Sequence, residues 1–111
     1  MNQHIILVED SNVQATQIQC YLQQYGLRIE IVASGYQAIT LIRQRLPAAV
    51  ILDVELPDLN GYVICRSIKN DPSTAHIPVV ILTMRDTHQD ALDGLIHGAV
   101  EHRGHLDAGR A

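Results

Sequence analysis

The segment from Val50 to Gly61 reads VILDVELPDLNG and joins an apolar run to a carboxylate and a turn. Its first three residues are typical of a strand that is buried on both faces, yet the run ends on Asp53. A Leu-Pro-Asp sequence that favours a turn begins three residues later, at Leu56. An aspartate at the end of a buried strand needs polar partners or a chemical role, because an unpaired carboxylate is costly to bury.

Three other segments have the composition of strands. HIILV (His4–Val8) and VVILT (79–83) are fully apolar or β-branched, like AVILDV (49–54), which contains the run above. LRIEIV (27–32) alternates apolar and polar residues, which predicts a strand with one less buried face. We expect the three apolar strands to be central in their sheet.

Helical patterns follow each of the strands. The first two helices are defined by apolar residues at steps of three and four, at Ala15, Ile18, Leu22 and Tyr25 and then at Ala38, Leu41, Ile42 and Leu46. A third helix is predicted from about Tyr62 to Lys69. A fourth opens with a capping box at Thr87 and Asp90 and reaches Gly98.

Residues that favour helix ends flank these first two patterns. Ser11 and Gln14 predict a capping box at the start of the first helix, and Gly26 predicts a left-handed cap at its end. Ser34 is the predicted cap of the second helix, with Pro47 just past its end. The order β-α-β-α-β-α-β-α predicts an α/β fold, a doubly wound parallel sheet with helices on both faces.

The overall composition excludes several classes of protein. With 111 residues and 47% hydrophobic content the chain suits one domain, and its net charge of −4 argues against a nucleic-acid partner. The start MNQHIILVED does not resemble a signal peptide, and no run is long enough to span a membrane. The two cysteines have no metal or redox spacing. We therefore expect a cytoplasmic domain with an aliphatic core.

Oxygen-bearing side chains stand at the ends of the apolar strands. Glu9 and Asp10 follow the first, Asp53 ends the second and Thr83 ends the third. In a parallel sheet these ends share one edge, where the ligand sites of such folds lie. Clustered carboxylates repel one another unless a cation lies among them, and an all-oxygen set suits Mg²⁺.

Each of these residues also has a simpler interpretation. Glu9 and Asp10 could only precede a helix and favour its positive end. Asp53 could cap the following turn, and the Thr83 hydroxyl could satisfy the backbone at a strand end. Their joint placement favours an acidic metal site over these separate explanations.

The chain resembles the receiver domain of two-component response regulators over residues 4 to about 101. The stretches that match are LVED (7–10), ILDVELPDLNGYVICRSIK (51–69), IPVVILT (77–83) and ALDGLIHGA (91–99). The resemblance implies a flavodoxin-like fold. It also implies phosphorylation of an aspartate by a histidine kinase or phosphotransfer protein, and a downstream output protein or domain.

The resemblance also implies a role for each site residue. Asp53 would be the phosphoacceptor, and Thr83 would be the switch hydroxyl that moves toward the phosphoryl group. Asp10 would bind Mg²⁺ directly, Glu9 would bind it through water, and the backbone carbonyl of Glu55 would complete the protein ligands.

The C-terminal part departs from the family pattern. The family lysine and the preceding aromatic residue correspond to His105 and His102, and Met84 is bulkier than the residue usual after the switch hydroxyl. The tail EHRGHLDAGRA (101–111) lacks the apolar run of a fifth strand and an amphipathic last helix. We expect a receiver domain at 1–101 and an atypical tail at 102–111, which is truncated, foreign or a genuine variant. An incomplete sheet face would favour self-association.

Three functions compete. A phosphoacceptor receiver is favoured by Glu9, Asp10, Asp53 and Thr83. A pseudo-receiver, used only for docking, is favoured by the missing lysine. The third is a phosphatase with an aspartyl nucleophile, but DVE (53–55) matches the two-aspartate signature of such enzymes only poorly.

Overall fold

The computed structural model describes residues 4–82 of the chain. Its elements are β1 (His4–Val8), α1 (Asn12–Gln23), β2 (Arg28–Val32), α2 (Gly35–Arg45), β3 (Ala49–Asp53), α3 (Gly61–Asn70) and β4 (Val79–Leu82). The predicted fourth helix, the fifth strand, the tail and the side chains of Thr83, His102 and His105 lie outside the described residues. No helix within 4–82 has the length and apolar character needed to cross a membrane.

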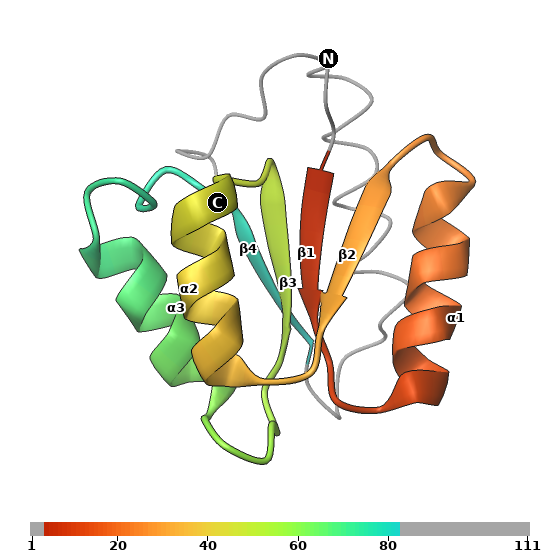
Figure 1. The fold of residues 1–111 in the computed structure, drawn as a ribbon, viewed down its shortest axis with the longest axis horizontal. Coiled ribbons are helices and arrows are strands. Elements are labelled where there is room, and N and C mark those ends of the chain that lie inside the picture. Colours follow the sequence, from red (N-terminus) through yellow and green to blue (C-terminus); the bar gives the residue numbers. More distant parts are fainter. Residues whose placement is uncertain (1–3, 83–111) are drawn as a thin grey trace.

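The four described strands form one parallel sheet in the order β2-β1-β3-β4. Helix α1 packs on one face of this sheet, and α2 and α3 pack on the other (Figure 1). The predicted doubly wound α/β fold is confirmed, with β2 at the outside of the sheet. Since β1 pairs directly with β3, the residues that follow both strands emerge side by side at the carboxyl edge.

Two aliphatic clusters hold the layers together. Alternate residues of a strand point to opposite faces, so Leu7 and Ile51 pack with α1, while Val8 and Leu52 pack with α2 and α3. All four side chains are fully buried. The central strands read as continuous apolar runs because both of their faces are covered.

The predicted helix starts are largely correct. The Ser34 hydroxyl caps α2 by accepting a bond from the backbone N–H of Gln37 at 3.3 Å, and the Ser11 hydroxyl caps α1 in the same way through Gln14. The other bond of the predicted capping box, from the Ser11 N–H to the Gln14 side chain, is wrong. The Ser11 N–H donates to the Glu9 carboxylate at 3.1 Å, so this donor is satisfied by the acidic edge of the sheet.

Two predicted apolar positions, Tyr25 and Leu46, are wrong. Helix α1 ends before Tyr25, which is 46% exposed. Gly26 has the predicted left-handed conformation (φ 79°), two residues beyond the cap at Gln24, in a turn closed by bonds to residues three positions back. Leu46 is the left-handed cap of α2 and is 50% exposed. The residue before a proline is driven out of the helical conformation, which explains why Leu46 leaves the apolar face.

Candidate phosphoacceptor and metal site

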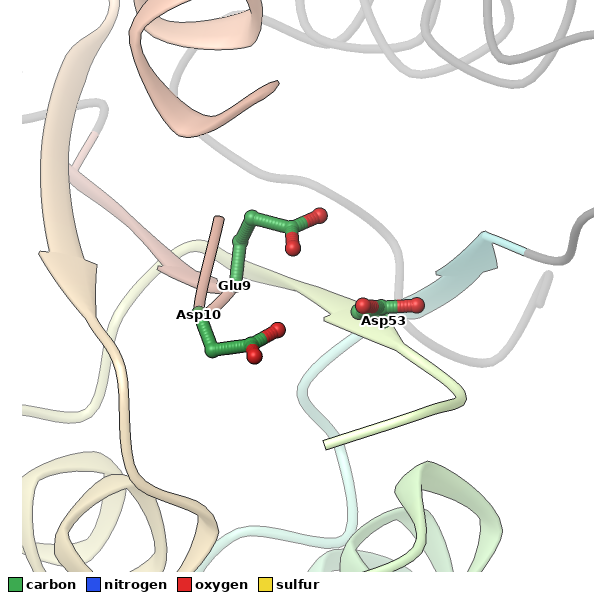
Figure 2. A group of neighbouring side chains, drawn as sticks. All are labelled: Glu9, Asp10 and Asp53. Carbon is green, nitrogen blue, oxygen red and sulfur yellow. The ribbon is translucent and has the colours of Figure 1, made fainter. Parts of the chain in front are cut away.

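Three carboxylates meet at the carboxyl edge of the sheet. Glu9 and Asp10 directly follow β1, Asp53 ends β3, and each offers an oxygen within 4.8 Å of the other two (Figure 2). Glu9 is 3% exposed, Asp53 is half-buried and Asp10 is exposed. The sequence therefore predicted correctly that these three side chains meet, because the pairing of β1 with β3 brings their strand ends together.

Glu9, the buried member of this cluster, has a shifted pKa. Burial raises the pKa of the Glu9 carboxyl from 4.5 to about 7. The bond from the Ser11 backbone N–H opposes this rise in pKa, while the nearby Asp53 and Asp10 add to it. Near neutral pH the metal-free cluster thus tends to hold a proton, which is how crowded carboxylates avoid carrying full charge.

This proton should make the metal-free domain less stable as the pH rises. A folded state that binds a proton more tightly than the unfolded chain is most favoured below the unfolded pKa. In EDTA, the free energy of unfolding is therefore expected to fall between pH 4.5 and about 7, as Glu9 ionises. Urea unfolding at a series of pH values measures this slope.

The Glu9→Gln variant is the control for this slope, since it keeps the shape of the side chain and removes the titration. The pKa values of Asp58 and Asp71 are lowered from 3.8, so these groups reduce stability only at more acidic pH. An unchanged slope in Glu9→Gln would assign the pH dependence to other groups.

The loop between β3 and α3 (residues 54–60) is closed tightly against the end of β3. The Gly61 N–H donates to the Val54 carbonyl at 2.9 Å, and Glu55 pairs with Asn60 in an isolated antiparallel bridge. The Asn60 side chain caps α3 through the N–H of Tyr62. This closure fixes the backbone that follows Asp53.

Asp53 also has the turn-capping contact that its simpler interpretation predicts. Its Oδ1 accepts a bond from the Glu55 N–H at 3.3 Å. The contact orients the carboxylate, which also lies beside Glu9 and Asp10 in the acidic cluster. Turn capping and membership of the acidic cluster are therefore compatible.

Gly61 permits this closure because it has no side chain. A Cβ at this position would lie 2.9 Å from the Cα of Val54 and would overlap the carbonyl oxygen of Asp53. We expect Gly61→Ala to lower the free energy of unfolding by about 1–3 kcal/mol through overpacking. We also expect it to weaken metal binding at Asp53, as measured by urea unfolding and Mg²⁺ titration.

Gly26→Ala is the comparison variant for Gly61→Ala. It strains a left-handed turn remote from the acidic cluster, with no atom in the way of the new methyl group. Equal metal affinity in Gly61→Ala and the wild type would show that the close approach of α3 does not shape the site.

The sequence did not single out Asp58, which lies within the loop. Its carboxylate accepts three hydrogen bonds from the start of α2, at Ser34, Gly35 and Tyr36. The segment LPDLNG indicated only a turn, and nothing local to it names a partner more than twenty residues earlier in the chain. A contact of this kind depends on how the layers pack.

The donor set of the cluster fits a hard cation. All three ligand groups are carboxylates, and no His or Cys joins them among residues 4–82. Oxygen-only sets of this kind suit Mg²⁺ or a similar ion, and a bound cation would let the three negative charges lie close together. The edge of the sheet therefore has the geometry and chemistry of an acidic cation site.

The fold agrees with the comparisons to known proteins. The model of the response regulator receiver domain family matches residues 5–102. The chain belongs to this family, whose members are receiver domains of two-component systems.

Relatives support the same assignment. The chain is 32% identical to the response regulator PleD of Caulobacter vibrioides over 99 residues, which cover 89% of the chain and 22% of PleD. It is 32% identical to protein PilH of Pseudomonas aeruginosa over 95 residues, covering 86% of the chain and 78% of PilH. The chain thus spans less than a quarter of PleD.

A solved structure shows the same fold with a metal ion. The receiver domain of the sensor histidine kinase PA1611 from Pseudomonas aeruginosa superposes with a TM-score of 0.73 at 26% identity, covering 87% of this chain and 99% of that domain. That structure has a magnesium ion coordinated in the active site cleft.

Proposed function

We propose that this receiver domain accepts a phosphoryl group on Asp53 from the phosphohistidine of a histidine kinase or phosphotransfer protein. The observation that carries the proposal is the meeting of Glu9, Asp10 and Asp53 within 4.8 Å at the ends of β1 and β3. A carboxylate that is half-buried, oriented by the Glu55 N–H and adjacent to a cation site is suited to act as a nucleophile.

The proposed reaction is a transfer between nitrogen and oxygen. An Asp53 carboxylate oxygen forms a bond to phosphorus, the phosphorus–nitrogen bond breaks, and its electron pair returns to the imidazole. Positioning and charge neutralisation do most of the work in such transfers. Glu9, Asp10, Asp53 and the Glu55 carbonyl would hold Mg²⁺, which when bound neutralises the charge of the carboxylates and phosphoryl oxygens.

The product would act as a switch. The phosphoryl group carries a charge of about −1.5 to −2, which replaces the single charge of the carboxylate, and it brings new acceptor oxygens. In the proposal, the Thr83 hydroxyl donates to these oxygens and moves its loop. His105 and His102 would take the family's lysine and aromatic positions. Such a change shifts the population between two surface conformations. The free energy that couples phosphorylation to binding of an output partner is expected to be about 1–3 kcal/mol. Water attack on the same phosphorus resets the domain.

Treatment with acetyl phosphate tests the proposal without a cognate kinase. The intact mass of the chain is expected to increase by one phosphoryl group in Mg²⁺, and to stay unchanged when EDTA replaces Mg²⁺. Absence of an adduct under both conditions, with beryllofluoride also failing to bind, would instead support the docking-only pseudo-receiver.

A further inference from the structure

The Asp58 carboxylate connects the phosphoacceptor loop to a different helix. Its Oδ1 accepts a bond from the Gly35 N–H at 3.0 Å. Its Oδ2 accepts bonds from the Ser34 hydroxyl at 2.9 Å and the Tyr36 N–H at 3.2 Å. Both oxygens are therefore used, and all three donors come from the N-terminus of α2.

These bonds complete the cap of α2. The first N–H groups of a helix have no partner within the helix. Here Gly35 and Tyr36 donate to Asp58, Gln37 donates to the Ser34 hydroxyl at 3.3 Å, and Ala38 donates to the Ser34 carbonyl at 3.0 Å. A carboxylate at this position also interacts favourably with the helix dipole.

The electrostatics are consistent with a persistent contact. The N–H of Gly35, together with the Ser34 hydroxyl and the Tyr36 N–H, lowers the pKa of Asp58 below its ordinary 3.8. Asp58 is therefore ionised at neutral pH. Hydrogen bonds to a charged acceptor are shorter and stronger than those between neutral groups.

The contact lies within the short loop that bears the site. Asp53 and Glu55 precede Asp58, and Asn60 and Gly61 close the loop behind it through the Glu55–Asn60 bridge and the Gly61–Val54 bond. The loop is thus fixed at its base by its own backbone and at its tip by α2. Close packing supports the tip contact, since a Cβ at Gly35 would lie 2.8 Å from the Cβ of Leu59.

We propose that Asp58 is a positioning residue of the phosphoacceptor site: by binding the N-terminus of α2, it holds the loop that sets Asp53 and the Glu55 backbone. This inference rests on the proposed function, because it assigns the anchor a role in metal binding and phosphoryl acceptance. It also predicts that α2, which has no residue in the acidic cluster, affects the site through this contact.

The Asp58→Ala variant tests the inference through Mg²⁺ affinity. We expect its dissociation constant for Mg²⁺, measured by calorimetry, to rise about tenfold, because the loop that Asp58 no longer holds must be ordered when the ion binds. The rate of the acetyl phosphate adduct at subsaturating Mg²⁺ should fall to a similar extent and recover at saturating Mg²⁺. Asp58→Asn, which retains one oxygen acceptor for Gly35, should restore part of the affinity.

Asp71→Ala is the matched control. Asp71 also accepts bonds from a nearby backbone N–H and hydroxyl, both of Ser73, and pairs with Arg43 at 2.9 Å. It follows α3 and therefore lies away from the carboxyl edge. We expect Asp71→Ala to reduce stability in urea like Asp58→Ala, and to leave the affinity for Mg²⁺ unchanged.

The outcomes separate this inference from the proposed function. Wild-type affinity for Mg²⁺ in Asp58→Ala, or an equal loss in Asp71→Ala, would overturn the positioning role and leave the contact as a helix cap only. Failure of the wild type to form an adduct would overturn the proposed function, and the Mg²⁺ titrations would still report whether Asp58 shapes the acidic site.

Discussion

Asp53→Asn is expected to abolish the acetyl phosphate adduct. The change keeps the size of the side chain and an oxygen that can accept the bond from the Glu55 N–H, so the loop should retain its closure. An amide does not attack phosphorus as a carboxylate does, so no acyl phosphate can form at this position. Intact mass spectrometry of both proteins in Mg²⁺ measures the result, with all of the added phosphoryl mass lost in the variant.

The nearby carboxylates supply the controls for this experiment. Glu55→Gln removes an exposed carboxylate two residues from Asp53 while retaining its backbone carbonyl, and Asp71→Asn removes one after α3. Both variants should form the adduct. An adduct of wild-type size in Asp53→Asn would place the phosphoryl group on another residue and refute the assignment of the nucleophile.

The sequence predicted the centre of this fold and site because both depend on short-range patterns. Continuous apolar runs at His4–Val8 and 49–52 indicate strands covered on both faces, and the rule that parallel strands end at one edge then brings Glu9, Asp10 and Asp53 together. The helix cap at Ser34 was predicted from its residue type.

The features that the sequence did not predict depend on competition between contacts. The Ser11 N–H donates to the Glu9 carboxylate, which is buried and is therefore costly to leave without hydrogen-bond donors. Asp58 finds its partners across the packing of α2 and α3, which no local pattern encodes. Leu46 fits the apolar spacing of α2, but the following Pro47 takes it out of the helix.

The raised pKa of Glu9 and the proposed cation site have one physical origin. In the metal-free domain a buried carboxyl beside two others is relieved by taking up a proton, and a bound cation would provide the same relief without the proton. Binding of Mg²⁺ should therefore release protons near pH 7 and should be weaker at lower pH. Removing a carboxylate from the cluster should therefore weaken cation binding more than it lowers the stability of the fold.

Asp10→Asn is accordingly expected to eliminate most of the stabilisation by Mg²⁺. A ligand at one hundred times its dissociation constant stabilises the folded state by about 2.7 kcal/mol. For a domain of this size that corresponds to a rise in Tm of about 10 °C or more. Asp10 is exposed, so its substitution should leave the Tm in EDTA within a degree or two of the wild-type value, about the effect of an ordinary surface change.

Thermal unfolding of both proteins in EDTA and in increasing Mg²⁺ measures this difference, and Asp71→Asn should respond to the ion as the wild type does. A rise in Tm of the same size in Asp10→Asn would show that the ion binds elsewhere. An equal loss of Tm in EDTA and in Mg²⁺ would show that Asp10 supports the fold and not the cation. The predicted pattern, an unchanged Tm without the ion and a lost response with it, follows only if this exposed carboxylate contributes to a shared cation site with Glu9 and Asp53.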